Sequence, residues 1–248
     1  MTELAIIGGT GLTSLKDLDI TKREVVHTPF GEPSGPLTHG VLSGKEVVFL
    51  ARHGYGHTIP PHRINYRANM WALHNTGVKK VIAVAAVGGI TDDLPSGMLA
   101  IPDQIIDYTS ARENTFFDDG LTHVTHIDFT EPYCEELRQL LIRGCLAAKL
   151  DYVPRGTYGT TQGPRLETAA EIERMARDGC TMVGMTGMPE AALARELELC
   201  YATCAVVVNK AAGRGTGPIT MHEIEQTVNQ GMDKVRLLLE SVVPLLNA

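Results

Sequence analysis

The sequence predicts an α/β fold built on a central mixed, largely parallel β-sheet flanked by helices. Short apolar runs rich in β-branched residues alternate with segments of helical periodicity, which is the pattern of such folds. No internal repeat, low-complexity linker or shift in composition divides the 248 residues, 44% of which are hydrophobic. We therefore expect one domain, residues 1–248, with a single sizeable core.

Five apolar runs are predicted to be buried strands, because Gly, Pro or polar residues bound each of them. They cover residues 4–7, 47–51, 81–87, 98–106 and 200–208. In open α/β sheets ligands bind beyond the carboxyl ends of the strands. The residues that follow these runs are therefore the first candidates for a functional site.

Helical spacing predicts two of the helices that flank the sheet. The apolar face of the first is formed by Ile64, Ala68, Trp71 and Ala72. The apolar face of the second, near the C-terminus, is formed by Ile224, Val228, Met232, Val235, Leu239 and Val242. Residues 109–128 are polar and aromatic without clear periodicity, so we expect a long excursion there, near a site or an interface.

The charge and cysteine content restrict the partners and the compartment. A formal net charge of −7 with scattered Lys and Arg argues against nucleic acid and anionic membranes as partners. No apolar segment is long enough to span a bilayer and the N-terminus lacks a basic signal-peptide region, so we expect a cytoplasmic protein. The cysteines form no Cys-x-x-Cys pair and indicate neither a disulfide framework nor a zinc site. We expect most to be core residues in a reducing compartment; they are Cys134, Cys145, Cys180, Cys200 and Cys204.

A glycine turn follows the first predicted strand. In Gly8-Gly9-Thr10-Gly11, backbone amides and the Thr10 hydroxyl can converge on an anion because no bulky side chain intervenes. Taken alone, the same turn could be an empty strand-to-loop connection. A dinucleotide site is a third interpretation, which we discount because the Gly-x-Gly-x-x-Gly spacing is missing.

Arg52 and His53 follow the second predicted strand. A planar, permanently charged guanidinium suits bidentate binding of an oxyanion. Taken singly, Arg52 could be a surface ion-pair residue, and His53 or His57 could be a turn residue. Two strand ends suited to anions in one chain favour a phosphate site.

Seven motifs occur in a fixed order along the chain. They are Ile-Gly-Gly-Thr-Gly at 7–11, Thr-Pro-Phe-Gly at 28–31, Ala-Arg-His-Gly at 51–54, His-Thr-Ile at 57–59, Asn-Tyr-Arg-Ala-Asn at 65–69, Gly-Pro-Arg at 163–165 and Met-Thr-Gly-Met-Pro-Glu at 185–190. Together they resemble the family of 5'-methylthioadenosine phosphorylase and purine nucleoside phosphorylase over nearly the whole chain. The resemblance implies a homotrimeric α/β phosphorylase without metal or cofactor, in which inorganic phosphate is a co-substrate that attacks the anomeric carbon of a nucleoside.

The resemblance also implies roles for individual residues, by motif position. The phosphate site would comprise Thr10, Arg52, His53 and Thr186, with Ala85 and Ala86 beside them. Met185 would lie under the ribose, although its closeness to Met182 and Met188 leaves a plain core role open. The residues expected to be catalytic are Arg52, Thr186 and Asn209.

The base site departs from the methylthioadenosine pattern. Where adenosine-type members carry paired aspartates, this chain has Asn209-Lys210-Ala211, and after Gly-Pro-Arg it has Leu166-Glu167, similar to phosphorylases of 6-oxopurines. An ionised Glu167 accepts from the N1–H of hypoxanthine or guanine and the Asn209 amide can donate to O6 or N7, whereas adenine presents a lone pair at N1. The alternative roles are a helix-start charge for Glu167 and a turn former for Asn209.

The 5'-position gives a further distinction. Family members that cleave inosine place a histidine where this chain has Met221, and an apolar thioether suits a methylthio group better than a hydroxyl. His126, in the excursion, matches a histidine that related trimers lend to a neighbouring subunit. The sequence ends at Ala248 without the longer tail that helps to close this pocket in methylthioadenosine enzymes, which leaves closure of the pocket open.

These residues together predict phosphorolysis of S-methyl-5'-thioinosine to hypoxanthine and 5-methylthioribose 1-phosphate, a purine salvage reaction. The nearest alternatives are a methylthioadenosine phosphorylase of relaxed base preference and a phosphorylase of inosine and guanosine. Two other classes stay open: a catalytically silent nucleoside-binding protein, and an oxidoreductase if the glycine turn binds a dinucleotide.

Overall fold

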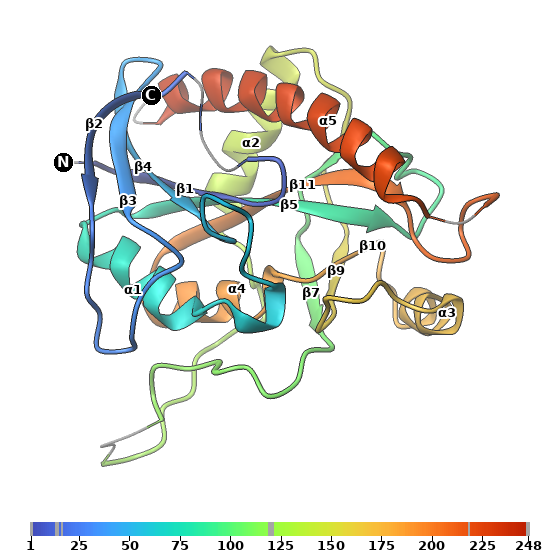
Figure 1. Ribbon diagram of the computed structural model, residues 1–248, viewed down its shortest axis with the longest axis horizontal. Helices are drawn as coiled ribbons and strands as arrows, with labels where there is room; N and C mark the ends of the chain where they lie inside the picture. The colour runs from blue at the N-terminus through green and yellow to red at the C-terminus, as the bar shows by residue number, and fades with distance from the viewer. Residues whose placement is uncertain (1, 13–14, 16, 119–121, 218, 247–248) are drawn as a thin grey trace.

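A single large sheet forms the centre of the molecule (Figure 1). The structure is a computed structural model and describes residues 2–12, 15, 17–118, 122–217 and 219–246. Within them the sheet has 11 strands, of which eight follow the order β2-β3-β4-β1-β5-β10-β9-β7. The remaining strands branch from this path, because β11 pairs with β5 and β6, and β6 pairs with β8.

The strands fall into three groups. An antiparallel meander at one edge comprises β2 (Asp19–Glu24), β3 (Leu37–Leu42) and β4 (Lys45–Ala51). The buried centre is parallel and comprises β4 together with β1 (Leu4–Gly8), β5 (Lys80–Gly89) and β11 (Cys200–Lys210). The far part comprises β6 (Leu99–Ala100), β7 (Gln104–Asp107), β8 (Tyr152–Val153), β9 (Thr157–Thr160) and β10 (Met182–Gly184). The predicted mixed, largely parallel sheet is confirmed.

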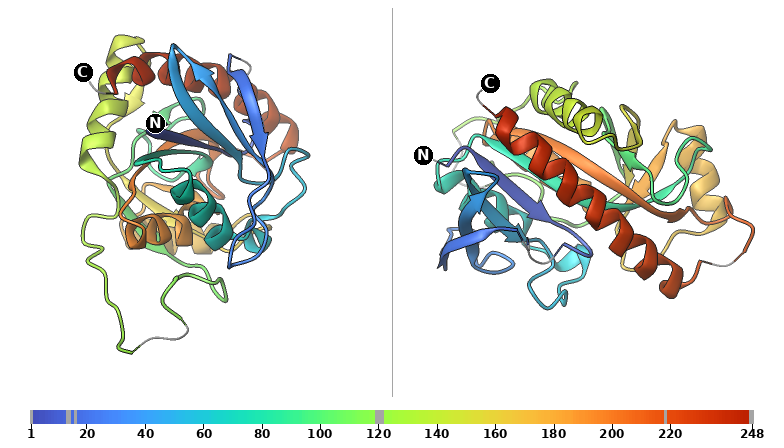
Figure 2. Two further views of the ribbon diagram at one scale, coloured as in Figure 1. Left: turned by 90° about the vertical axis from the view of Figure 1, so that its left-hand side faces the viewer. Right: turned by 90° about the horizontal axis from the view of Figure 1, so that it is seen from above.

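Helices cover both faces of the central strands (Figure 1). One face is covered by α2 (Glu135–Ala147) and α5 (Met221–Val242), and the right-hand view of Figure 2 shows α5 running along the sheet. The other face is covered by α1 (Tyr66–Asn75) and α4 (Gly187–Glu196), while α3 (Ala169–Arg177) lies beyond β9 and β10. The short 3₁₀ helices are η1 (Pro61–Arg63) and η2 (Val243–Leu245).

The alternation of side chains in β1 explains why both faces need a helical layer. Leu4 and Ile6 join the cluster that contains α2 and α5, whereas Ala5 and Ile7 join the cluster that contains α1 and α4. Side chains of a strand point alternately to its two faces, so a strand that is apolar at every position must be covered on both. All five residues of β1 are buried.

Two details of the predicted elements were wrong. The run 98–106 is not one strand, because Pro102 has no N–H to donate and the chain leaves β6 there before it joins β9 as β7. Ile64 precedes α1, which begins at Tyr66 after Asn65 accepts a bond from the Ala68 amide. Trp71 is only partly buried, and Met70 and Leu73 complete the buried face of α1 with Ala68 and Ala72.

The expectation that the chain has no disulfide was also wrong. Cys134, just before α2, is bonded to Cys200 at the start of β11. The Cys134 amide donates to the Tyr201 carbonyl at 2.8 Å, so α2 begins directly beside β11, although 66 residues separate the two cysteines in sequence. Cys145, Cys180 and Cys204 are free and buried, as predicted.

The predicted excursion has neither helix nor strand in its described part, residues 109–118 and 122–128. It extends away from the body of the molecule below α1 and α4 (Figure 1). Among the described helices, none combines the length and the hydropathy needed to cross a membrane.

Candidate active site

A cavity of about 410 Å³ lies at the carboxyl ends of the parallel strands. It is lined by residues that follow β1, β4 and β11, by residues near the end of β5, and by the loops before α3 and α4. Twelve of the predicted site residues line it: Thr10, Arg52, His53, Ala85, Ala86, Leu166, Glu167, Met185, Thr186, Asn209, Ala211 and Met221. Residues more than 200 positions apart in sequence therefore share one cavity.

Arg52 and the glycine turn meet at one end of the cavity. The Arg52 amide donates to the Gly8 carbonyl at 3.0 Å, which joins the end of β4 to the end of β1. A Cβ atom on Gly9 would lie 2.5 Å from the Val84 carbonyl oxygen and 3.0 Å from Nη1 of Arg52. Only glycine allows the turn to pack this closely on the guanidinium.

Glu190 in α4 fixes the Arg52 side chain. Its two carboxylate oxygens accept from Nε and Nη2 of Arg52, each at 2.7 Å, and Nη1 of Arg52 donates to the Val84 carbonyl at 2.8 Å. Tyr201 donates to the same carboxylate at 2.8 Å. These contacts use three of the five guanidinium N–H groups, so two have no partner among the described residues and can donate to an oxyanion in the cavity.

The Arg52 charge is maintained although the side chain is buried. Burial alone would lower the pKa of Arg52, but the neighbouring Glu190 carboxylate raises it above its usual value. A buried charge is tolerated when it is paired and hydrogen-bonded. Sequence reasoning assigned no role to Glu190, although a carboxylate inside the apolar segment 188–194 is a signal that it pairs with a buried cation.

His53 is held in one orientation by the turn that follows β4. Its Nδ1 donates to the Ile59 carbonyl at 2.8 Å, and the ring of His57 lies 4.7 Å away, centroid to centroid. Burial, followed by the charge of Arg52, lowers the pKa of His53 to about 4. In the unliganded protein His53 is therefore neutral at pH 7, and its Nε2 is an acceptor.

Thr186 lies between β10 and α4 and lines the cavity. It is the N-cap residue of α4, and its side chain makes no capping hydrogen bond. The Thr186 hydroxyl is therefore not committed to the helix. Met185 precedes it and packs on Gly163, whose φ of +61° and missing Cβ leave room for the Met185 sulfur.

A β-bulge orients Asn209 at the other end of the cavity. The pairing of β11 with β5 slips between Val207 and Asn209, so Val208 is an extra residue in the strand. A bulge changes the direction in which the following side chain points. Both Val208 and Asn209 line the cavity as a result. One N–H of the Asn209 amide donates to the Lys210 carbonyl at 2.7 Å, and the other stays free.

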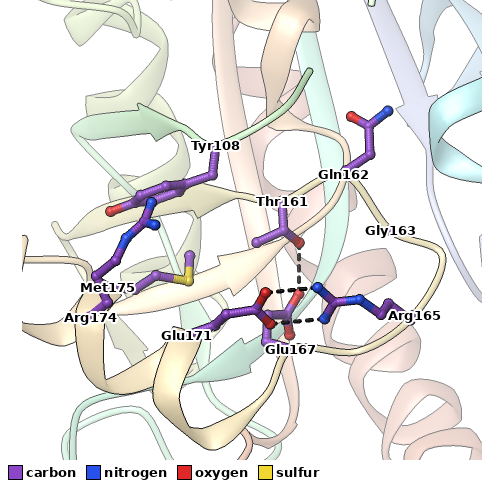
Figure 3. Close-up of a pocket in the computed structure, with 9 residues that line it drawn as sticks. All are labelled: Tyr108, Thr161, Gln162, Gly163, Arg165, Glu167, Glu171, Arg174 and Met175. Atoms are coloured by element: carbon purple, nitrogen blue, oxygen red, sulfur yellow. Dashed lines mark hydrogen bonds and ion pairs between the residues drawn. The ribbon is translucent and has the colours of Figure 1, made fainter. Parts of the chain in front are cut away.

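Glu167, in the loop before α3, lines two cavities. Besides the main cavity it lines a smaller one of about 200 Å³, shown in Figure 3 with Tyr108, Arg165 and Glu171. The Thr161 hydroxyl donates to Oε1 of Glu167 at 2.6 Å. The neighbouring Arg165 is bound to Glu171 through two contacts of 2.8 and 2.7 Å, so it does not neutralise Glu167 directly.

Two predicted site residues lie outside the cavity lining. The Lys210 side chain points away, because its Nζ donates to the Thr91 carbonyl at 2.8 Å. His126 is exposed in the excursion and lines no part of the cavity within this chain. Met221 lines the cavity, but it is 65% exposed at the N-terminus of α5.

Arg112 is a second residue that sequence reasoning missed. From the excursion, its guanidinium donates to the backbone carbonyls of Thr161 and Gln162 at 3.2 and 2.9 Å and to that of Met185 at 2.9 Å. It also stacks over the Tyr66 ring, 5.4 Å from the centroid. One side chain thus ties together the two loops that carry Glu167 and Thr186. No local pattern around Arg112 signals this role.

The described residues contain no group of three or more His, Cys, Asp or Glu side chains that could hold a metal ion. The polar groups that converge on the cavity are instead donors for an anion at one end and a carboxylate with an amide at the other. These groups are chemically suited to an anion and to a ring with polar edges, and they share one small-molecule cavity.

In α/β sheets small-molecule sites lie at the carboxyl edge, where this cavity is found. The chain matches the phosphorylase superfamily over residues 3–244. It belongs to that superfamily, as a pentosyltransferase of the purine nucleoside phosphorylase type.

Relatives and solved structures agree with this assignment. A protein of Pseudomonas syringae named "Probable S-methyl-5'-thioinosine phosphorylase" is 55% identical over 98% of this chain and 99% of its own. A 6-oxopurine nucleoside phosphorylase of Pyrococcus furiosus is 47% identical over 99% of this chain and 94% of its own. The structure of methylthioadenosine phosphorylase from Schistosoma mansoni in complex with adenine superposes with a TM-score of 0.95 at 32% identity, covering 99% of this chain and 92% of that one.

Proposed function

We propose that this protein cleaves S-methyl-5'-thioinosine with inorganic phosphate and releases hypoxanthine and 5-methylthioribose 1-phosphate. The observation that supports the proposal is that Glu167 and Asn209 line the same cavity as Arg52 and Thr186. Relatives named for this activity and a relative named for 6-oxopurine nucleosides support it.

The phosphate is proposed to bind between the glycine turn and α4. Its oxygens accept hydrogen bonds from three kinds of donor. These are the two remaining N–H groups of Arg52, the hydroxyl groups of Thr10 and Thr186, and the backbone amides of the glycine turn. Nε2 of His53 accepts from the protonated oxygen of monohydrogen phosphate, and Ala85 and Ala86 are small enough to let the phosphate approach β5. The phosphate is a co-substrate, and the proposal requires no metal or cofactor.

The base is proposed to bind between Glu167 and Asn209. Hypoxanthine carries a donor at N1 and an acceptor at O6, which match a carboxylate and an amide N–H. Adenine would place a lone pair against the carboxylate, and an unsatisfied buried polar contact costs about 1–3 kcal/mol. Leu166 and Ala211 are proposed to complete the wall around the ring.

The reaction follows from these positions. The glycosidic C1'–N9 bond breaks as a phosphate oxygen bonds to C1', and the electron pair of the broken bond leaves with the purine. The purine becomes neutral hypoxanthine by taking up the proton that monohydrogen phosphate loses. Asn209 donates to the purine as negative charge builds there, while the phosphate faces the positive charge of the sugar. No residue becomes a covalent nucleophile, since the protein acts by holding the reactants in contact.

The 5'-methylthio group is proposed to contact Met221, which lines the cavity and is largely exposed in the part of the chain that the structure describes. A homotrimer, in which His126 of one subunit contacts the cavity of the next, would cover Met221. A cytoplasmic location fits a salvage enzyme with a nucleoside substrate. These are parts of the proposal.

The test is to incubate the purified protein with S-methyl-5'-thioinosine, with and without phosphate, and to measure hypoxanthine and the sugar phosphate. Equal amounts of both products, formed only with phosphate, are expected. Parallel reactions with inosine address the second candidate, a 6-oxopurine nucleoside phosphorylase, which the Pyrococcus relative favours. Release of base without phosphate, or no release, would contradict the proposal.

A further inference from the structure

We propose that Thr161 is a positioning residue that sets the base specificity of the site by orienting Glu167. Thr161 lines the smaller cavity of Figure 3 and not the main one, so it acts on the base only through Glu167. The inference rests on the proposed function, because it concerns the preference for a 6-oxopurine.

The hydrogen bond between the Thr161 and Glu167 side chains is short, and it is the one hydrogen bond to the Glu167 carboxylate among the described residues. The Thr161 hydroxyl lies 2.6 Å from Oε1 of Glu167 and 3.3 Å from the Gly184 carbonyl oxygen. A hydroxyl has one proton, and the shorter contact to a charged acceptor takes it. Among the described residues, no other hydrogen-bond partner holds the Glu167 carboxylate, which projects from an irregular loop.

Thr161 is itself fixed through both its backbone amide and its backbone carbonyl. Its amide donates to the Gly184 carbonyl at 2.8 Å, which extends the pairing of β9 with β10, and its own carbonyl accepts from Arg112 at 3.2 Å. Through Thr161, the sheet and Arg112 therefore fix the position of the Glu167 side chain. Oε2 stays available to accept from a base in the main cavity.

This arrangement predicts which substrates depend on Thr161. A base with an N1–H needs the carboxylate in one place, whereas adenine has a lone pair at N1 and no N1–H to donate to it. The N1–H bond exists both in the bound nucleoside and in the transition state, so losing its orientation weakens binding more than it slows the chemical step. A general loss of structure would instead affect both substrates alike.

The experiment compares Thr161→Val, Thr161→Ser and Thr160→Val with the wild type. Valine keeps the shape of threonine without the hydroxyl, and serine keeps the hydroxyl. Thr160 is the matched control, because it is the adjacent threonine, is fully buried, and has no hydrogen-bond partner for its Oγ1 among the described residues. For each protein, kcat and KM are measured with S-methyl-5'-thioinosine and with methylthioadenosine, and Kd is measured with hypoxanthine and adenine.

Thr161→Val should raise KM for S-methyl-5'-thioinosine and Kd for hypoxanthine about tenfold, as expected for a lost bond to a charged group, with kcat within about twofold. KM for methylthioadenosine and Kd for adenine should stay unchanged in Thr161→Val. Thr161→Ser and Thr160→Val should behave as wild type with all four ligands. Equal losses with both bases, or an unchanged Kd for hypoxanthine, would overturn the role of Thr161. A wild type that prefers methylthioadenosine would instead contradict the proposed function. If Thr161→Val does not fold, Thr161→Ala carries the same test.

Discussion

The guanidinium of Arg52 and the carboxylate of Glu190 form a two-point ion pair beneath the cavity, with both side chains 1% exposed. The pair joins the end of β4 to α4, so it connects the two walls of the proposed phosphate site. Removing one partner of a buried pair leaves the other charge uncompensated.

Glu190→Gln should therefore lower the free energy of unfolding by about 3–5 kcal/mol, the usual cost of breaking such a pair, and raise KM for phosphate. Denaturant unfolding and phosphate titrations measure the two effects. Glu173→Gln is the control, because Glu173 is half exposed in its pairs with Arg177 and Arg214 and should cost less than about 1 kcal/mol. A Glu190→Gln protein as stable as the control would refute the structural role of the pair.

Asn209→Asp should raise the cleavage of methylthioadenosine relative to S-methyl-5'-thioinosine. The carboxylate accepts from the 6-amino group of adenine and repels O6 of hypoxanthine, so the ratio of kcat/KM values should shift by about tenfold or more. Asn75→Asp, at the exposed end of α1, is the control. An unchanged ratio in Asn209→Asp would remove Asn209 as a determinant of base preference.

The lowered pKa of His53 predicts how stability depends on pH. Between pH 6.5 and about 4, His53 is protonated in the unfolded chain but neutral in the folded protein. The free energy of unfolding therefore falls as the pH falls through this window. The change in the free energy of unfolding due to His53 is about 3 kcal/mol at its largest, from the difference between the pKa of His53 in the unfolded and in the folded state. Above pH 6.5 the contribution is constant, since both states are neutral there.

The comparison is with His53→Asn, whose side-chain amide can still donate to the Ile59 carbonyl. Its unfolding free energy should fall less steeply than that of the wild type between pH 6.5 and 4. His74→Asn, exposed on α1, should follow the wild-type curve. Parallel curves for wild type and His53→Asn would show that His53 takes up its proton equally in both states.

Met221→His should increase the cleavage of inosine relative to S-methyl-5'-thioinosine. A histidine can hydrogen-bond a 5'-hydroxyl, whereas the thioether of methionine favours the methylthio group. The shift in the kcat/KM ratio should be about tenfold, and Asn229→His, exposed on α5 outside the cavity, should leave the ratio unchanged. Loss of activity on both substrates in equal proportion would argue against contact with the 5'-position.

Much of the site could be predicted because strand ends are visible in the sequence. Arg52, Thr10 and Asn209 each follow an apolar run, and parallel strands bring such positions to one edge of a sheet. The fold class was predictable for the same reason. Residues whose role depends on a particular tertiary contact could not be predicted in this way.

Thr161 and Arg112 illustrate that limit. Thr161 matters because the loop before α3 folds back on it, and Arg112 matters because an excursion without periodicity returns to two distant loops. Lys210 is the opposite case. Its place in the base motif predicted a contact with the substrate, but its Nζ donates to the Thr91 carbonyl and its side chain lies outside the cavity lining. A long-range pair such as Cys134 with Cys200 has no local signal either.

The central claim is that the cavity prefers a 6-oxopurine carrying a 5'-methylthio group. Its most direct test is one reaction that contains phosphate and equal concentrations of S-methyl-5'-thioinosine, methylthioadenosine and inosine, followed by chromatography of the nucleosides remaining. Initial rates in such a mixture report the ratios of kcat/KM. S-methyl-5'-thioinosine should disappear at least about tenfold faster than either competitor. Faster loss of methylthioadenosine would contradict the roles of Glu167 and Asn209, and faster loss of inosine would contradict that of Met221.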